Sequence, residues 1–168
     1  MTVSSFRQIV EALNGAGVRY LVVGGIAVIA HGYVRLTVDV DLMLQLEPQN
    51  IIRGLSALAG LGFRPTIPVT SEDFADAGKR QLWIEQKQMK VLKLYSDAHR
   101  ETSIDVFVSD PLGFEEAIRR VHYYPLAEDV QVPVCGYEDL VKLKLLASRP
   151  KDLLDLDQLK KARGESDG

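Results

Sequence analysis

The sequence predicts one α/β or α+β domain built around a mixed β-sheet. Its 168 residues are enough for a single domain with a sizeable core and too few for two ordinary domains. The composition, 46% hydrophobic and 26% charged, is typical of a folded globular protein. Segments with strand-like alternation follow segments with helical spacing along the chain, and no repeat or Ser/Gly/Pro-rich linker divides them.

Bulk properties exclude several classes of protein. The net charge of -3 argues against nonspecific electrostatic binding of nucleic acid, although a local basic patch remains compatible with it. A single cysteine, Cys135, excludes an intramolecular disulfide and a cysteine-based zinc cluster, and its apolar neighbours predict a buried packing role. The N-terminus has no secretory pattern, and the apolar stretch 20–30 is interrupted by glycines and far shorter than about 18 residues. We therefore expect a cytoplasmic protein with no membrane partner.

The first half of the chain predicts three helices and two strands. Apolar residues at 6, 9, 10 and 13 lie on one helical face, and Asn14-Gly15 ends that helix. The apolar run 20–23 predicts a buried strand that enters a tight turn at Gly24-Gly25. Further helices are expected at 26–31 and 51–61.

The segment 38–47 carries the clearest strand pattern in the sequence. Its even positions are Val, Val, Leu, Leu and Leu, whereas its odd positions are Asp, Asp, Met, Gln and Glu. Alternation with a period of two predicts a strand with one core face and one polar face.

The second half of the chain is expected to mix strands and helices. Residues 65–78 hold several turn signals and acids, which predict a mobile surface loop; whether it closes over a substrate as a lid stays open. The expected elements are strands at 90–95, 103–108 and 130–134 and helices at 110–121, 137–147 and 153–159. We expect a single domain over residues 1–163, with a C-terminal helical segment at about 137–163 and a disordered tail at 164–168.

Three aspartates are the first candidates for chemistry. Asp39 and Asp41 lie two positions apart on the predicted strand, so both carboxylates project from one face. Asp105 has an equivalent place in the strand Ile104-Asp105-Val106-Phe107. Three carboxylates on adjacent strands can hold two divalent ions roughly 3.5–4 Å apart, and oxygen ligands without His or Cys favour Mg²⁺ or Mn²⁺. The alternative is that these aspartates are ordinary surface acids.

The Gly24-Gly25 turn is the second candidate feature. A turn without side chains between a strand and a helix lets backbone N–H groups approach a phosphate. A bare Gly-Gly pair is more often a plain turn, and neither a Walker loop nor a dinucleotide-binding fingerprint is present.

Together these features resemble a known superfamily. Val23-Gly24-Gly25 followed by Asp39-Val40-Asp41-Leu42 resembles the signature of the polymerase-β-like nucleotidyltransferases. The run GGIAVIAHGYVRLTVDVDLML looks like the branch that contains the AbiEii-type toxins. The late run KLLASRPKDLLDL matches that family's second pattern at Lys144, Arg149, Lys151, Asp152 and Asp155. The resemblance covers about residues 18–160 and implies a nucleotidyltransferase fold: a mixed sheet flanked by helices, with a short C-terminal helical segment.

The resemblance also implies roles for the motif residues. Gly24 and Gly25 would contact the nucleotide phosphates, and Asp39 and Asp41 would bind the metals. Asp105 would be the third carboxylate and either the base or a metal-held activator for the acceptor hydroxyl. Two Mg²⁺ or Mn²⁺ ions are the cofactors that it implies.

Several residues beside these motifs have two interpretations. Arg35 and Thr37 precede the acids, where they would touch phosphate or serve structurally. Lys144 would either steady the triphosphate or be a lysine whose stem packs on the apolar side of its helix. Four charged residues, Arg149, Lys151, Asp152 and Asp155, would brace the helix break or lie on the acceptor side. His31 is expected to cap or pack beside Gly32.

The activity implied is the transfer of a nucleoside monophosphate from an NTP to a hydroxyl on RNA such as tRNA, on a protein or on a small molecule. By analogy the chain would be the toxin of a toxin–antitoxin pair, with a cognate antitoxin as partner. Since longer toxins of this kind carry more C-terminal helix, either the acceptor site is shallow or a second subunit completes it in a homodimer. Four aromatic residues are candidates for stacking on a base, although core packing is their commoner fate: Trp83, Tyr95, Tyr123 and Tyr124.

Three other hypotheses compete with a toxin. An antibiotic-modifying nucleotidyltransferase would be an enzyme of the same class. A non-catalytic nucleotide-binding or partner-binding module that keeps the fold is a different class, and the complete aspartate set counts against it. A structural domain with surface acids is the third.

Overall fold

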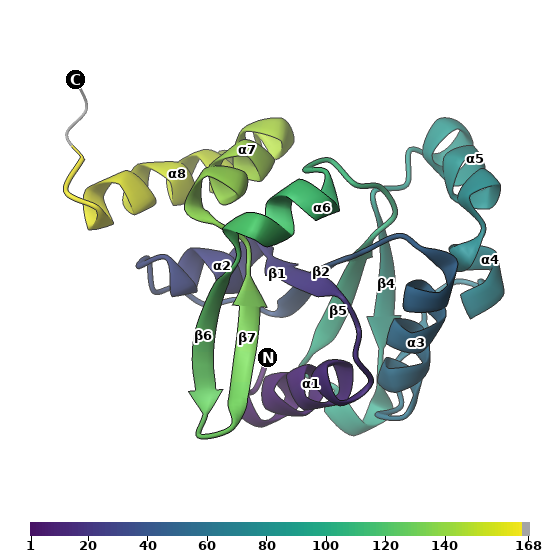
Figure 1. Cartoon of the computed structure of the whole chain (residues 1–168). Coiled ribbons are helices and arrows are strands. Elements are labelled where there is room, and N and C mark those ends of the chain that lie inside the picture. The colour runs from purple at the N-terminus through teal and green to yellow at the C-terminus, as the bar shows by residue number, and fades with distance from the viewer. Residues whose placement is uncertain (166–168) are drawn as a thin grey trace.

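The computed structural model describes residues 1–165 and shows a mixed sheet with helices packed around it (Figure 1). The described helices are α1 (Val3–Gly15), α2 (Gly24–Ala30), α3 (Pro48–Ala59), α4 (Ser71–Ala75), α5 (Ala77–Lys87), α6 (Phe114–Ala117), α7 (Tyr137–Ala147) and α8 (Pro150–Ala162), with 3-10 turns η1 (Asp97–His99) and η2 (Ile118–Arg120). The predicted fold class, an α/β domain with a mixed sheet, is confirmed.

The sheet has seven strands in the order β3-β4-β5-β2-β1-β7-β6. They are β1 (Tyr20–Val23), β2 (Asp39–Leu44), β3 (Arg64–Pro65), β4 (Val91–Tyr95), β5 (Ser103–Phe107), β6 (His122–Ala127) and β7 (Val130–Val134). The pairs β1–β7 and β2–β5 are parallel, and the other pairs are antiparallel. The parallel pair β2–β5 brings the two aspartate-bearing strands side by side at the centre of the sheet.

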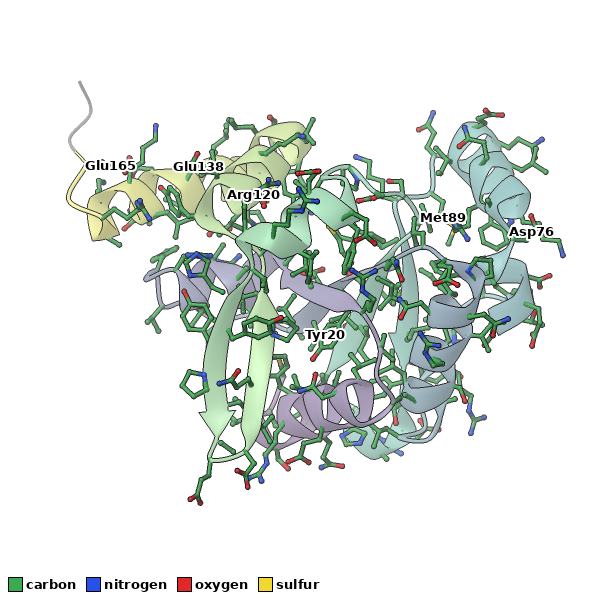
Figure 2. The ribbon with its side chains drawn as sticks, in the orientation of Figure 1. Tyr20, Asp76, Met89, Arg120, Glu138 and Glu165 are labelled. Atoms are coloured by element: carbon green, nitrogen blue, oxygen red, sulfur yellow. The ribbon has the colours of Figure 1, made fainter. Side chains whose placement is uncertain are left out.

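Helices gather at both ends of the sheet. In Figure 1, α6, α7 and α8 lie at the top of the view and α1 at the bottom. Helix α2 contacts β1, β2 and α7, and α7 in turn packs on α8. Tyr20, labelled in Figure 2, donates a hydrogen bond from its hydroxyl to Asn14 Oδ1 at 2.9 Å, which ties the end of α1 to β1. Because α2 begins at the glycine turn, its contact with α7 holds the C-terminal helices near that turn.

The strand predicted at 38–47 is present but shorter, and its faces differ from the prediction. Val40, Leu42 and Leu44 are buried as expected, but Val38 is 62% exposed and precedes β2. Met43, assigned to the polar face, is 1% exposed. The prediction was wrong at these two positions. Val38 lies outside the strand, and Met43 is buried although it lies on the same face as Asp39 and Asp41.

The segment 65–78 was predicted as a mobile loop, and that prediction was wrong. It begins in β3, and α4 follows with a capping box in which Thr70 and Asp73 satisfy each other's backbone N–H groups. Phe74 is fully buried. The turn residues therefore cap a helix that packs on α3.

Other boundaries also moved. The helix predicted at 110–121 begins only at Phe114, because Gly113 has a positive φ of 72° and Asp110 Oδ2 accepts the Phe114 N–H at 2.8 Å. Helix α5 and strand β6 were not predicted. Cys135 is fully buried, as predicted. The expectation of a disordered tail falls partly on residues 166–168, which lie outside the described residues.

No described helix is both long and apolar enough to cross a membrane.

Candidate active site

Three aspartates share one face at the centre of the sheet. Asp41 on β2 pairs in register with Asp105 on β5, and Asp39 precedes Asp41 by two residues on the same strand. All three line a cavity of about 550 Å³, a size that suits a small-molecule ligand. The sheet therefore brings together the carboxylates that the sequence singled out.

The glycine turn lies directly against Asp41. Gly24 has a φ of +67°, and a Cβ on it would lie 2.1 Å from Asp41 Oδ2, so only glycine fits. A Cβ on Gly25 would lie 2.5 Å from Thr37 Oγ1. The backbone N–H of Gly25 donates a hydrogen bond to the Asp41 carboxylate. Helix α2 begins at Gly24, two residues earlier than predicted.

Asp41 is the aspartate whose ionisation is most disfavoured. Burial, followed by repulsion from Asp105 and Asp39, raises its pKa to about 6. The Gly25 N–H and the Lys144 ammonium oppose this rise without cancelling it. A cation beside Asp41 would relieve the repulsion.

Asp39 and Asp105 share a cation that the sequence analysis did not single out. Lys93 on β4 pairs in register with Asp105, and its Nζ lies 2.8 Å from Asp105 Oδ1 and 3.4 Å from Asp39 Oδ1. Burial would raise the pKa of Asp39, but the Ser103 hydroxyl, which donates to it, and Lys93 outweigh burial, so its pKa lies below the ordinary value. The alternation around Leu92 and Leu94 is a sequence signal that places Lys93 on the polar face of its strand. Its position beside Asp105 follows from the pairing of β4 with β5.

A network of buried charges lies beside the carboxylates. Lys144, only 6% exposed, places its Nζ 3.1 Å from Asp152 Oδ1 and 2.8 Å from Asp155 Oδ2. Arg35 binds Asp155 through two nitrogens at 2.8 and 2.9 Å. Arg149 reaches Asp152 at 2.7 Å across the α7–α8 turn. The late motif thus lies next to the loop that leads into β2.

This network has strongly ionised carboxylates. Burial would raise the pKa of Asp152, but ion pairs with Arg149 and Lys144 outweigh it and hold the pKa at about 2. The pKa of Asp155 is also lowered, because Arg35 and Lys144 outweigh its burial. Two carboxylates share three cations, which leaves one unit of positive charge facing the cavity.

The remaining predicted residues divide between the cavity wall and its support. Thr37, Arg149, Lys151 and Asp152 line the cavity, whereas Asp155 lies behind Arg35 and Lys144. Thr37 Oγ1 donates to the Asp39 carbonyl at 3.4 Å. Lys151 lies close enough to Asp39 to lower the pKa of that carboxyl.

Apolar side chains line the other side of the cavity. They come from α5, from the segment between α5 and β4, from the strands β4 and β5 and from α7: Ile84, Met89, Val91, Phe107, Leu140 and Leu143. Met89, labelled in Figure 2, lies between α5 and the body of the domain. One charged wall and one apolar wall suit a ligand that has both phosphates and a flat apolar face.

Other candidates from the sequence lie elsewhere. His31 packs edge-on against Tyr137 with ring centroids 5.8 Å apart, and its Nε2 lies 2.8 Å from the Cys135 carbonyl oxygen, as a packing residue would. None of the four aromatic candidates for stacking on a base is among the described residues that line the cavity. Trp83 packs against Phe74 with ring centroids 6.5 Å apart.

The three aspartates of the cavity have the chemistry of ligands for a divalent cation. Among residues 1–165, no three acidic, imidazole or thiol groups form a ready-made metal cluster. Asp105 Oδ1 is nonetheless buried, and its partner among the described residues is the Lys93 ammonium at 2.8 Å. The donor set is three hard carboxylates, one with a raised pKa. These residues fit Mg²⁺ or Mn²⁺ once Lys93 moves aside.

Comparisons with known proteins identify a family and a fold. Residues 10–168 match the family described as "Nucleotidyl transferase AbiEii toxin, Type IV TA system". A crystal structure of a Thermotoga maritima protein, provisionally assigned as a nucleotidyltransferase, superimposes with a TM-score of 0.57 at 12% identity. The match covers 93% of this chain and 90% of that one, and at this identity it shows the fold alone. No curated protein matches the sequence significantly.

Proposed function

The chain belongs to the AbiEii nucleotidyl transferase family and is a nucleotidyltransferase, and from this premise we propose that it uses Mg²⁺ or Mn²⁺ to transfer a nucleoside monophosphate from an NTP to a hydroxyl acceptor. One observation carries the proposal. Asp39, Asp41 and Asp105 face one cavity from two parallel strands, beside a glycine turn and a wall of cations. Hard oxygen ligands next to excess positive charge suit a metal-bound triphosphate.

Asp39, Asp41 and Asp105 would hold the cations, of which the sequence suggests two. When bound, such ions neutralise phosphate charge and make a hydroxyl more acidic. Gly24 and Gly25 offer a backbone surface that no side chain obstructs, since Cβ atoms there would collide with their surroundings.

The protein's own groups would carry the rest of the reaction. The acceptor oxygen bonds to the α-phosphorus of the NTP as the bond from that phosphorus to its β-bridging oxygen breaks, and pyrophosphate leaves. Asp105 takes the proton of the attacking hydroxyl. Lys144, Arg35 and Arg149 contribute fixed positive charge on the side where the phosphates would lie, and because ion pairs already hold them, little reorganisation is needed.

The acceptor is the part of the reaction that needs an experiment. Purified protein would be incubated with each α-³²P-labelled NTP, Mg²⁺ and either total RNA or total protein. We expect one macromolecular pool to be labelled by the wild type and neither pool by Asp41→Asn. Labelled RNA such as tRNA, labelled protein, or label in neither pool but in small molecules would each identify the acceptor class. No labelled product in any fraction, with any NTP, would contradict the proposal.

The family description names a toxin, so we propose that this chain acts as the toxin of a toxin–antitoxin pair. Induced expression of the wild type is expected to arrest bacterial growth, whereas Asp41→Asn is expected to leave growth unchanged. Co-expression of a neighbouring small gene would then test for an antitoxin partner. Growth arrest by both forms would argue against toxicity through catalysis.

A further inference from the structure

Lys93 is the one cation in direct contact with the carboxylate cluster, among the residues that the structure describes. It comes from β4, whose register places it beside Asp105, which in turn lies beside Asp41 on β2. Its ammonium touches Asp105 at 2.8 Å and Asp39 at 3.4 Å. The row Lys93–Asp105–Asp41 therefore crosses three strands on one face of the sheet.

This contact differs from an ordinary surface ion pair in two ways. It joins one ammonium to carboxylates on two strands, and the Asp105 side chain beneath it is only 14% exposed. Asp105 Oδ1 is itself buried, and among the described residues the Lys93 ammonium is the one cation in contact with it. An oxygen in that condition can accept a stronger cation ligand.

Lys93 itself can leave. Its side chain is 46% exposed, and no described group other than the two carboxylates is in ionic contact with it. An ammonium and a divalent ion within about 4 Å of each other repel strongly in a partly buried site. A metal ion that binds these carboxylates must therefore displace Lys93.

On the basis of the proposed function, we propose that Lys93 is the resident counter-ion of the Asp39–Asp41–Asp105 cluster and makes divalent-metal binding depend on nucleotide. A free metal ion would have to displace Lys93 and leave the ammonium unpaired beside a dication. A metal ion that arrives with NTP brings the negative charge of the triphosphate, which offers the displaced ammonium a new partner. Lys93 is thus a positioning residue that couples occupation of the metal site to NTP.

The test is Mn²⁺ binding measured by the EPR signal of free Mn²⁺, with and without a nonhydrolysable NTP analogue. Four proteins would be compared: wild type, Lys93→Met, Lys93→Arg and Lys90→Met. Lys90→Met is the matched control, because Lys90 also lines the cavity, from the residue before β4, and forms no ion pair with the described carboxylates. Thermal denaturation would verify that each variant is folded.

Without nucleotide, Lys93→Met is expected to bind Mn²⁺ about tenfold or more tightly than the wild type, because a cation within reach of a carboxylate shifts its affinity for positive charge by that order. Lys93→Arg and Lys90→Met are expected to resemble the wild type. With the analogue, the wild type is expected to gain Mn²⁺ affinity, and Lys93→Met is expected to gain much less.

Each contrary outcome has a distinct meaning. One contrary outcome is that the wild type binds Mn²⁺ with the analogue, but that without the analogue Lys93→Met binds Mn²⁺ no more tightly than the wild type does. That outcome overturns the inference about Lys93 and leaves the proposed function standing. Tight binding of free Mn²⁺ by the wild type would also overturn the inference. If no folded form binds Mn²⁺ under any condition, the carboxylates are not a metal site and the proposed function itself fails.

Discussion

Replacing Asp41 with asparagine is expected to stabilise the protein while it abolishes activity. The pKa of Asp41 rises from the ordinary value of 3.8 to about 6 because of burial and of repulsion from Asp105 and Asp39. The folded state therefore holds this proton more tightly than the unfolded chain does, so the destabilising contribution of Asp41 is absent below pH ~4 and develops as the pH rises to ~6. Two pKa units correspond to about 3 kcal/mol, and partial access to solvent reduces the penalty to about 1–3 kcal/mol.

Asparagine keeps the shape and an acceptor for the Gly25 N–H but carries no charge. Urea unfolding near pH 7 is therefore expected to show Asp41→Asn more stable than the wild type by about 1–3 kcal/mol, with a melting temperature higher by roughly 3–10 °C. The difference should vanish near pH 4. The matched control is Asp157→Asn on α8, where a surface pair with Lys161 contributes about 0–1 kcal/mol. An Asp41→Asn variant less stable than the wild type at neutral pH would refute the electrostatic reasoning.

Three further predictions concern the network and the turn. Asp155→Ala is expected to lower the free energy of unfolding by about 3 kcal/mol, measured in urea, because it leaves Lys144 with one partner in a buried site; a loss below 1 kcal/mol would count against the network. Asp152, with a pKa of about 2, is expected to contribute stability above pH ~4 that is lost as the pH falls toward 2, so circular dichroism should show a shallower acid transition for Asp152→Asn. Gly24→Ala is expected to weaken NTP binding and to lower the melting temperature, since its Cβ would collide with a carboxylate, whereas Gly15→Ala, which has open space, should be neutral; equal behaviour of the two would contradict the fit at the turn.

The fold was predictable where one periodic signal dominated. Alternation found β5 and β7, and helical spacing found α1 and α7. It failed for Met43, which is buried on the strand face that carries Asp39 and Asp41. It also failed for α4 and α5, where turn-forming residues cap helices and do not mark a loop. Local sequence reports the preference of a segment but not what packs on its second face.

The site was predictable where its residues form linear motifs. The spacing of Gly24, Asp39 and Asp41 suggested a shared site, and the structure places all three on one cavity. Lys93 was missed because its importance depends on which strand lies beside β5, and strand order is a long-range property. Likewise, the pairing of Arg35 with Asp155 joins positions 120 residues apart, and neither residue type indicates its partner.

The central claim is that this cavity transfers a nucleotidyl group, and the position of the transferred phosphate tests it most directly. Parallel reactions would contain the active NTP labelled at either the α- or the γ-phosphate, with Mg²⁺ and the labelled acceptor pool. Nucleotidyl transfer predicts that the α-label enters the acceptor and that the γ-label leaves as pyrophosphate. With Asp41→Asn, neither the labelled acceptor nor labelled pyrophosphate is expected. Transfer of the γ-label to the acceptor, or equal α-labelling by wild type and Asp41→Asn, would contradict it.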